Sequence, residues 1–184
     1  MDKAEVLIDP ITYADIFLAA DLCPVEVSGL AKVKREGDKF LIFGEAIIFE
    51  QNCRSDGMST EFDPEAHGKW IHEMIQSGRQ EEVGQARLWW HSHAYATVYF
   101  SGTDYRTINS FGNFYSEWWL HLVVNKHREM LLRLDEYKPE RSHLYIDNLK
   151  LSRAMTRSDL ESLIKERRTR MAEIIKAKVK VVKG

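Results

Sequence analysis

The segment WWHSHAYATVYFSGTD, residues 89–104, places two histidines one residue apart and an aspartate eleven residues beyond the second. Its first part predicts a strand, and TDYRTINSF, residues 103–111, predicts a short helix. Side chains alternate along a strand, so His91 and His93 are expected on one face, where two imidazoles can bind one metal ion. Catalytic zinc sites usually have three protein ligands, and Asp104 is the candidate for the third.

Ser101 is the second polar residue of this segment with a candidate role. If the short helix starts near Ser101, the serine and Asp104 lie one turn apart and share a face. The hydroxyl could donate a hydrogen bond to an oxyanion or cap the helix, and the two roles are compatible. A chance His-x-His is expected in roughly a quarter of such chains, but adding the serine and aspartate offsets lowers this to about one in a thousand.

The residues before this segment predict two helices and a hairpin. Residues 10–24 begin and end at proline and predict a helix. Residues 25–51 are rich in β-branched and aromatic side chains and predict two strands around a turn at residues 35–38. Asp63 and Pro64 are suited to the cap and first turn of a second helix, which should end near Gly78.

The residues after the segment predict more strands and a terminal helix. Residues 118–137 predict a second hairpin that turns at residues 125–128, and residues 142–152 predict one further strand. SDLE, residues 158–161, matches a capping box and predicts a long helix to follow. The fold class is therefore α/β, with a mixed, curved sheet built largely from hairpins and flanked by helices.

Composition favours one domain with a basic end. The chain has 184 residues, of which 44% are hydrophobic, and shows no internal repeat or linker-like tract. We expect a domain over residues 1–151, with 16 Lys and Arg against 24 Asp and Glu. Residues 152–184 carry 10 against 4 and should form a basic C-terminal helix, packed on the domain or extending from it.

The same composition narrows the location and the partners. No stretch approaches the roughly 20 apolar residues needed to cross a bilayer, which predicts a soluble protein without a membrane partner. Cys23 and Cys53 form no Cys-x-x-Cys pair, which favours a reducing, cytoplasmic location. The net charge of −2 argues against a protein built around nucleic acid.

The segment contains His91-x-His93, then Ser101 after seven further residues and Asp104 after two more. This spacing resembles the signature of the JAMM (MPN/JAB) metallopeptidases. That family is completed by an upstream glutamate, which CPVEVSG supplies here as Glu26. The resemblance covers most of the chain and is closest to compact prokaryotic or phage-type members. It implies a single JAB/MPN-type domain with zinc held by the two histidines and the aspartate. One departure is Ala94, where the family often has proline.

The resemblance implies a zinc-dependent isopeptidase or peptidase. It would hydrolyse an amide at or near the C-terminal tail of a ubiquitin-like or other small protein modifier, with Glu26 as the general base and Ser101 as an oxyanion donor. One alternative is a hydrolase of a small amide or a sulfur-carrier conjugate. Another is a non-catalytic MPN-type scaffold subunit, and a third is a DNA-associated role for the basic tail. A homodimer is left open.

Other residues compete for some of these roles. Glu45 lies in the apolar run FLIFGEAIIF and is the second candidate for the base. HEMIQ, residues 72–76, lacks the final histidine of a His-Glu-x-x-His zinc motif. No function is assigned to the lone histidines, namely His67, His121, His127 and His143.

Aromatic side chains lie on both sides of the histidine pair. The pairs Trp89-Trp90 and Trp118-Trp119 are expected to belong mainly to the core. AYATVYF, residues 94–100, is expected to form one wall of the substrate groove, where large substrate side chains would collide with Tyr95, Tyr99 or Phe100.

Overall fold

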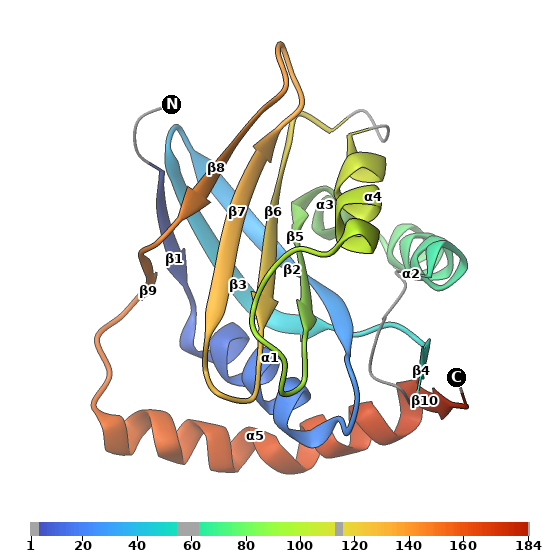
Figure 1. Cartoon of the computed structure of the whole chain (residues 1–184), viewed down its shortest axis with the longest axis vertical. Coiled ribbons are helices and arrows are strands. Elements are labelled where there is room, and N and C mark those ends of the chain that lie inside the picture. Colours follow the sequence, from blue (N-terminus) through green and yellow to red (C-terminus); the bar gives the residue numbers. More distant parts are fainter. Residues whose placement is uncertain (1–3, 55–62, 113–115, 184) are drawn as a thin grey trace.

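The computed structural model describes residues 4–54, 63–112 and 116–183 of the chain. These residues form an α/β fold in which helices flank a large, curved, mixed sheet (Figure 1). The helices are α1 (Pro10–Leu22), α2 (Pro64–Gln76), α3 (Gln80–Gln85), α4 (Gly102–Phe111) and α5 (Arg157–Lys178). The strands are β1 (Glu5–Ile8), β2 (Ser28–Glu36), β3 (Lys39–Ile47), β4 (Gln51–Arg54), β5 (Ala86–Ser92), β6 (Trp118–Val124), β7 (Met130–Glu136), β8 (Ser142–Ile146), β9 (Leu149–Leu151) and β10 (Val179–Val182).

The main sheet has eight strands in the order β8-β7-β6-β5-β2-β3-β1-β9. The predicted hairpins β2–β3 and β6–β7 are antiparallel, whereas β5–β6, β1–β3 and β1–β9 are parallel, so the predicted mixed sheet is confirmed. β8 and β9 lie at opposite edges, yet only Asp147 and Asn148 separate them. Three Cα–Cα steps span at most about 11 Å, so the two edges come close together there and the sheet is nearly barrel-like.

α1 is the helix that the core surrounds most completely. Asp9 accepts a hydrogen bond from the Ile11 amide at 2.8 Å, and Pro10 occupies the first turn, as the sequence predicts. α5 packs against α1, and Arg167 of α5 donates to Asp15 of α1 at 2.5 and 2.9 Å. α1 therefore lies between the sheet and α5, which runs along one end of the molecule (Figure 1).

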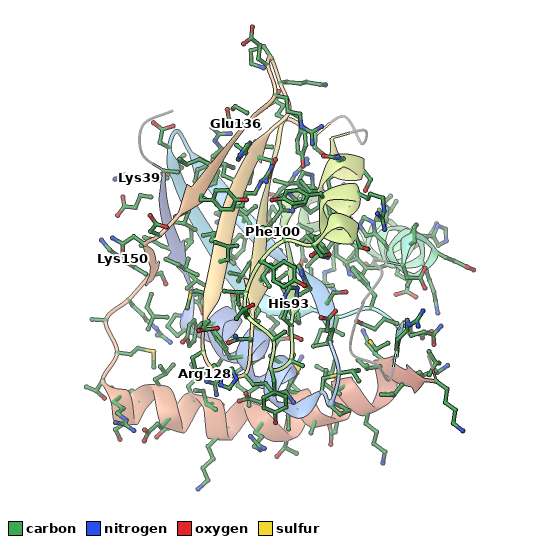
Figure 2. All side chains as sticks on the ribbon, viewed as in Figure 1. Lys39, His93, Phe100, Arg128, Glu136 and Lys150 are labelled. Atoms are coloured by element: carbon green, nitrogen blue, oxygen red, sulfur yellow. The ribbon has the colours of Figure 1, made fainter. Side chains whose placement is uncertain are left out.

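The turn between β6 and β7 also contacts α1. Arg128, labelled in Figure 2, donates to Asp21 of α1 at 2.7 Å. Its guanidinium carbon lies 5.0 Å from the centre of the Phe17 ring. Because these contacts join the turn to the helix, the turn has a fixed support outside the sheet.

The sheet is covered on both faces. Trp90 packs into the core cluster that includes α1, and its neighbour Trp89 packs into the cluster that includes α4. Both indoles are buried, and Trp119 is buried as well, while Trp118 is half-buried. The prediction that these tryptophans belong mainly to the core is confirmed, and alternation along each strand sends neighbours to opposite faces.

Several expectations need correction. Residues 142–152 form two strands, β8 and β9, rather than one, and they pair with different neighbours. The capping box of α5 is formed by Thr156 and Asp159, so the helix starts before the predicted SDLE motif. β1, β4 and β10 were not predicted, because each is only four residues long and pairs with distant segments.

The C-terminal segment packs on the rest of the fold. Met171 and Ile175 of α5 are buried in the main core cluster. β10 pairs in parallel with β4 to form a separate two-stranded sheet. None of the helices in the described part of the chain has both the length and the apolar character of a membrane span.

Candidate metal centre

Two of the candidate ligands lie at the end of β5, in the centre of the sheet. β5 pairs with β2 on one side and β6 on the other, and both His91 and His93 are buried. Their Nε2 atoms are 3.1 Å apart, so both imidazoles point to one place, as strand alternation predicts.

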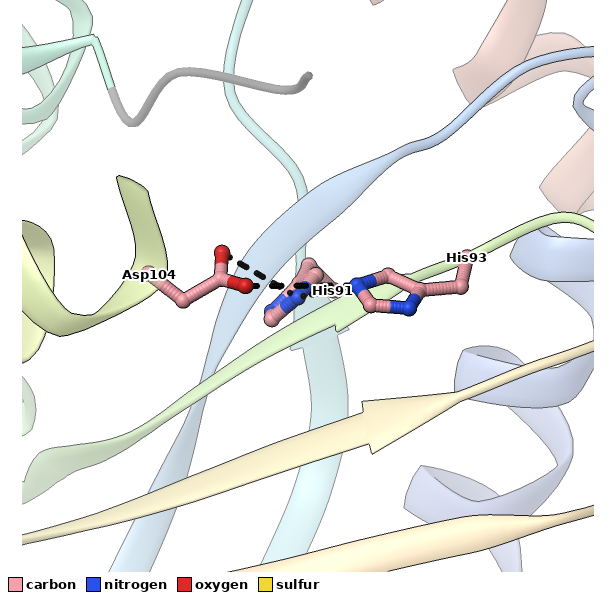
Figure 3. A group of neighbouring side chains, drawn as sticks. All are labelled: His91, His93 and Asp104. Carbon is pink, nitrogen blue, oxygen red and sulfur yellow. Dashed lines mark hydrogen bonds and ion pairs between the residues drawn. The ribbon is translucent and has the colours of Figure 1, made fainter. Parts of the chain in front are cut away.

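The third candidate ligand comes from the first turn of α4. Ser101 and Asp104 form a capping box: the Ser101 amide donates to Asp104 Oδ2 at 2.6 Å, and the Asp104 amide donates to Ser101 Oγ at 3.2 Å. This cap fixes the carboxylate, and Asp104 Oδ1 lies 3.3 Å from His91 Nε2. Asp104 Oδ2 lies 4.0 Å from His93 Nε2 (Figure 3). The structure therefore brings together the three residues that the sequence predicts as ligands.

The donor set fits a single zinc ion. Ligand atoms about 2.0–2.1 Å from a tetrahedral zinc lie about 3.3 Å from one another. His91 Nε2 lies 3.1 Å from His93 Nε2 and 3.3 Å from Asp104 Oδ1, and one ligand atom from each of the three residues lies within 4.8 Å of the other two. Two imidazole nitrogens and one carboxylate oxygen leave the fourth position of such a site open.

His93 has its tautomer fixed by the backbone. Its Nδ1 lies 2.9 Å from the carbonyl oxygen of Thr97, which can only accept, so Nδ1 carries the proton and Nε2 keeps its lone pair. A hydrogen bond from the second ring nitrogen is typical of histidines that bind metals. Thr97 lies in the loop between β5 and α4, in which Ala94 has a φ of 45°. Proline cannot adopt that φ, so this loop conformation is incompatible with proline at position 94.

Protonation in the site favours metal binding. Burial lowers the pKa of His93, and the neighbouring His91 lowers it further, against the opposite effects of Thr97 and Asp104. Burial alone would raise the pKa of Asp104, but hydrogen bonds and charge from His91 and Ser101 hold it below its usual value. A neutral imidazole and an ionised carboxylate are the forms that bind metals.

His91 is supported by an aromatic ring. Among the described residues its buried Nδ1 has no hydrogen-bond partner. The ring stacks instead on Trp89, with centroids 4.7 Å apart and an angle of 24° between the planes. Trp89 in turn contacts the edge of His121, a lone histidine to which the sequence assigns no role.

A polar cluster behind Trp89 was not predicted. His121 is fully buried, with Nε2 3.3 Å from the Tyr137 hydroxyl and 3.7 Å from Asp135 Oδ2. Burial lowers the pKa of His121, and Arg133 lowers it further. Arg133 forms two hydrogen bonds with Asp135, at 2.6 and 2.7 Å. The sequence held one signal for this cluster. His121 lies on one strand of the predicted hairpin, and Arg133 and Asp135 lie two residues apart on the other, so strand alternation places Arg133 and Asp135 on one face.

Backbone register relates Glu26 to the ligands. In the antiparallel pair of β2 and β5, Ser28 lies opposite His91, and the Ser92 amide donates to the Val27 carbonyl at 2.9 Å. The same register continued by one more residue puts Glu26 opposite His93. Residues that face each other in an antiparallel pair share a face of the sheet, so the backbone supports the predicted position of the base.

The second candidate base is occupied elsewhere. Glu45, on β3, accepts hydrogen bonds from Arg167 at 3.2 Å and from Arg170 at 2.7 Å, both on α5. Its side chain is 47% exposed, so the run FLIFGEAIIF does not bury its charge. These ion pairs give Glu45 a structural role in joining α5 to the sheet.

The cysteines do not contribute to the metal centre. Cys23 and Cys53 are both free and buried. Burial raises the pKa of the Cys53 thiol to about 12, and Cys23 and Glu26 add to this effect. Neither cysteine belongs to the group of described residues whose ligand atoms converge here, so nitrogen and oxygen are the candidate ligand atoms of this site.

The aromatic loop after His93 lies beside the candidate ligands. Tyr99 meets the His93 ring edge-on, with centroids 4.9 Å apart, and is 52% exposed. Tyr95 is 68% exposed and contacts His127 and Lys126. Phe100 is buried, so it packs the core rather than lining an open groove as predicted.

A separate cavity of about 500 Å³ lies between α2, α3 and α4. Phe111, Trp119 and Ile71 contribute to its walls, but His91, His93 and Asp104 do not. Its chemistry is therefore distinct from that of the metal centre, and we place the candidate active site at the three ligands.

Ser101 shows the capping role. Its hydroxyl oxygen accepts from the Asp104 amide, and its side chain also forms a hydrogen bond that helps to lower the pKa of the Asp104 carboxyl. We expect Ser101→Ala to lower the free energy of unfolding by about 1 kcal/mol, since it removes a cap. If the site hydrolyses an amide and Ser101 is the predicted oxyanion donor, turnover should also fall by about 10²-fold. Chemical denaturation and a hydrolysis assay of the zinc-loaded protein measure the two effects.

The matched control is Thr156→Ala, which removes the equivalent cap of α5. It should lower stability by a similar amount and leave turnover unchanged. If Ser101→Ala also leaves turnover unchanged, the serine acts only as a cap.

Comparison with known proteins bears on the fold of this chain. No family model matches the chain, and no curated protein matches it. The chain is similar in structure to protein DSY2949 from Desulfitobacterium hafniense, whose solution structure has a TM-score of 0.50 to it and 16% sequence identity. The match covers 80% of this chain and 94% of that chain, and it concerns the fold alone.

Proposed function

We propose that this chain is a zinc-dependent peptidase or isopeptidase with a single JAB/MPN-type domain, as its resemblance to the JAMM metallopeptidases implies. The observation that carries the proposal is the convergence of His91, His93 and Asp104, whose candidate ligand atoms all lie within 4.8 Å of one another. These residues come from a strand end and a helix start that only the fold brings together. The function proposed is hydrolysis of an amide at or near the C-terminal tail of a ubiquitin-like or other small protein modifier.

Each residue of the site has a separate task. Zinc, when bound, supplies a Lewis acid that polarises a carbonyl group and makes water acidic near neutral pH. Glu26 accepts the proton of the attacking water and returns it to the leaving amine. The Ser101 hydroxyl donates a hydrogen bond to the oxyanion that develops on the substrate carbonyl. Asp104 as a carboxylate and the two histidines as neutral imidazoles would hold the metal.

Tyr99 supports a preference for a small substrate tail. It is exposed and lies against the ring of His93, so a side chain next to the scissile bond would meet it. Glycine residues pass such a ring without collision. We therefore propose that a Gly-Gly type tail binds in extended form along the loop of residues 94–100.

A panel of tail peptides tests this function. The zinc-loaded protein is expected to cleave after a Gly-Gly tail at least about tenfold faster than after tails with leucine in either place, because leucine collides with Tyr99. Tyr99→Ala should reduce that preference, measured as the ratio of kcat/KM values. Tyr95→Ala is the control, since Tyr95 contacts His127 and Lys126 rather than a ligand.

Two results would argue against the proposal. Absence of cleavage of any tail peptide by the zinc-loaded protein would favour a small amide, a sulfur-carrier conjugate or a non-catalytic scaffold. Cleavage that ignores leucine would remove Tyr99 from substrate selection. The complete ligand set counts against the scaffold alternative, since the metal ligands are what such subunits usually lack.

A further inference from the structure

The loop that fixes the tautomer of His93 has little support of its own. Residues 94–100 form neither helix nor strand, and Ala96 and Thr97 are exposed. The Ala96 amide donates to the His93 carbonyl at 2.8 Å and closes a turn. Val98 and Phe100 pack on the cluster that includes α4, whereas the exposed Ala96 and Thr97 are held by hydrogen bonds, including one from a neighbouring element.

The β6–β7 turn provides that support. The Lys126 amide donates to the Ala94 carbonyl at 2.8 Å, and Asn125 Nδ2 donates to the Ala96 carbonyl at 3.0 Å. The second bond holds the peptide group that joins Ala96 to Thr97. The turn closes the β6–β7 hairpin and contacts α1 through Arg128 and Asp21, so it has support outside the loop.

Asn125 uses every donor and acceptor of its amide. The residue is fully buried, and Nδ2 also donates to Glu129 Oε2 at 2.6 Å. Oδ1 accepts from the amides of His127 and Glu129, both at 3.0 Å. The bonds to Oδ1 stabilise the turn, as asparagine often does. The bond to Ala96 joins segments 29 residues apart and is not needed for the turn.

We propose that Asn125 is a positioning residue for the metal centre, which sets the tautomer and the zinc affinity of His93 through the Thr97 carbonyl. The amide holds the Ala96–Thr97 peptide, the Thr97 carbonyl holds the proton on His93 Nδ1, and Nε2 stays free for the metal. Outer partners of this kind typically change metal affinity by about 10–100-fold. The inference rests on the proposed zinc site and adds a residue that does not touch the metal.

The test exchanges the donor without removing the turn. In the double variant Asn125→Asp with Glu129→Gln, the new carboxylate still accepts from the turn amides and from the new glutamine. It cannot donate to the Ala96 carbonyl. Glu129→Gln alone is the matched control, because Asn125 keeps its bond to Ala96 there.

Two measurements separate positioning from stability. Nitrogen-15 NMR of the metal-free protein reports which ring nitrogen of His93 carries the proton, and competition with a chromophoric chelator reports zinc affinity. The control should match the wild type, with the proton on Nδ1. The double variant should show a mixture of tautomers and bind zinc about 10–100-fold more weakly, while denaturation confirms that it is folded.

The outcomes distinguish this inference from the proposed function. If the folded double variant keeps the Nδ1 tautomer and zinc affinity within twofold of the control, Asn125 serves only the turn and the inference is wrong. If the tautomer changes as expected but the wild type binds no zinc, the link from Asn125 to His93 stands and the zinc assignment fails.

Discussion

Glu26→Gln is expected to lower turnover by at least about 10²-fold while the protein keeps its zinc. The change replaces a carboxylate by an amide of nearly the same shape, so it removes proton transfer and leaves the three ligands intact. The register of β2 and β5 supports this role, since its continuation beyond Ser28 and His91 would bring Glu26 opposite His93. Single-turnover rates of zinc-loaded wild type and variant measure the effect directly.

The chain offers a matched control for this carboxylate. Glu45→Gln makes the same chemical change at a residue held by Arg167 and Arg170 on α5. It should leave turnover within a few-fold of the wild type. Loss of activity in Glu45→Gln but not in Glu26→Gln would reverse the assignment, and loss of zinc in Glu26→Gln would make Glu26 a ligand or a structural residue.

The second large effect is expected from Asp104→Asn, which should weaken zinc binding by at least about 10²-fold and remove activity at limiting zinc. The variant loses a charged ligand, whose removal should exceed the 10–100-fold loss typical of an outer partner. The amide oxygen can still accept from the Ser101 amide, so the start of α4 should survive. Chelator competition gives the affinity, and circular dichroism checks the fold.

Asp159→Asn is the control for the cap. Asp159 holds the same capping-box position at the start of α5, where it accepts from Thr156. This variant should bind zinc as the wild type does. Equal zinc affinity in Asp104→Asn and Asp159→Asn would show that the aspartate of α4 is a helix cap and not a ligand.

The sequence predicted the parts of the fold that depend on local signals. Pro10 and Pro64 mark helix starts, and the two hairpins follow from alternating apolar residues around short turns. The three candidate ligands were also named from the sequence, because alternation places His91 and His93 on one face and Asp104 follows at a short distance along the chain; the structure brings them together. The position of α4 relative to β5, however, is a property of the fold.

The features that could not be predicted from the sequence depend on pairing between segments that are far apart along the chain. β9 pairs with β1 across nearly the whole chain, and β10 pairs with β4, and no local pattern of residues encodes such partners. Thr156 caps α5 in preference to Ser158, although both are good caps, because the geometry of the chain before the helix decides the start. Asn125 was predicted as a turn residue, but its contact with Ala96 could not be predicted, since that hydrogen bond exists only after β5 and β6 have paired.

The most direct test of the account is the zinc content of the purified protein, determined by elemental analysis beside His91→Ala. His91 supplies a buried nitrogen 3.1 Å from that of His93 and 3.3 Å from an oxygen of Asp104, so no zinc site of this geometry remains without it. The account predicts about one zinc per chain in the wild type and almost none in the folded variant. Equal zinc in both proteins, or none in the zinc-supplemented wild type, would contradict it.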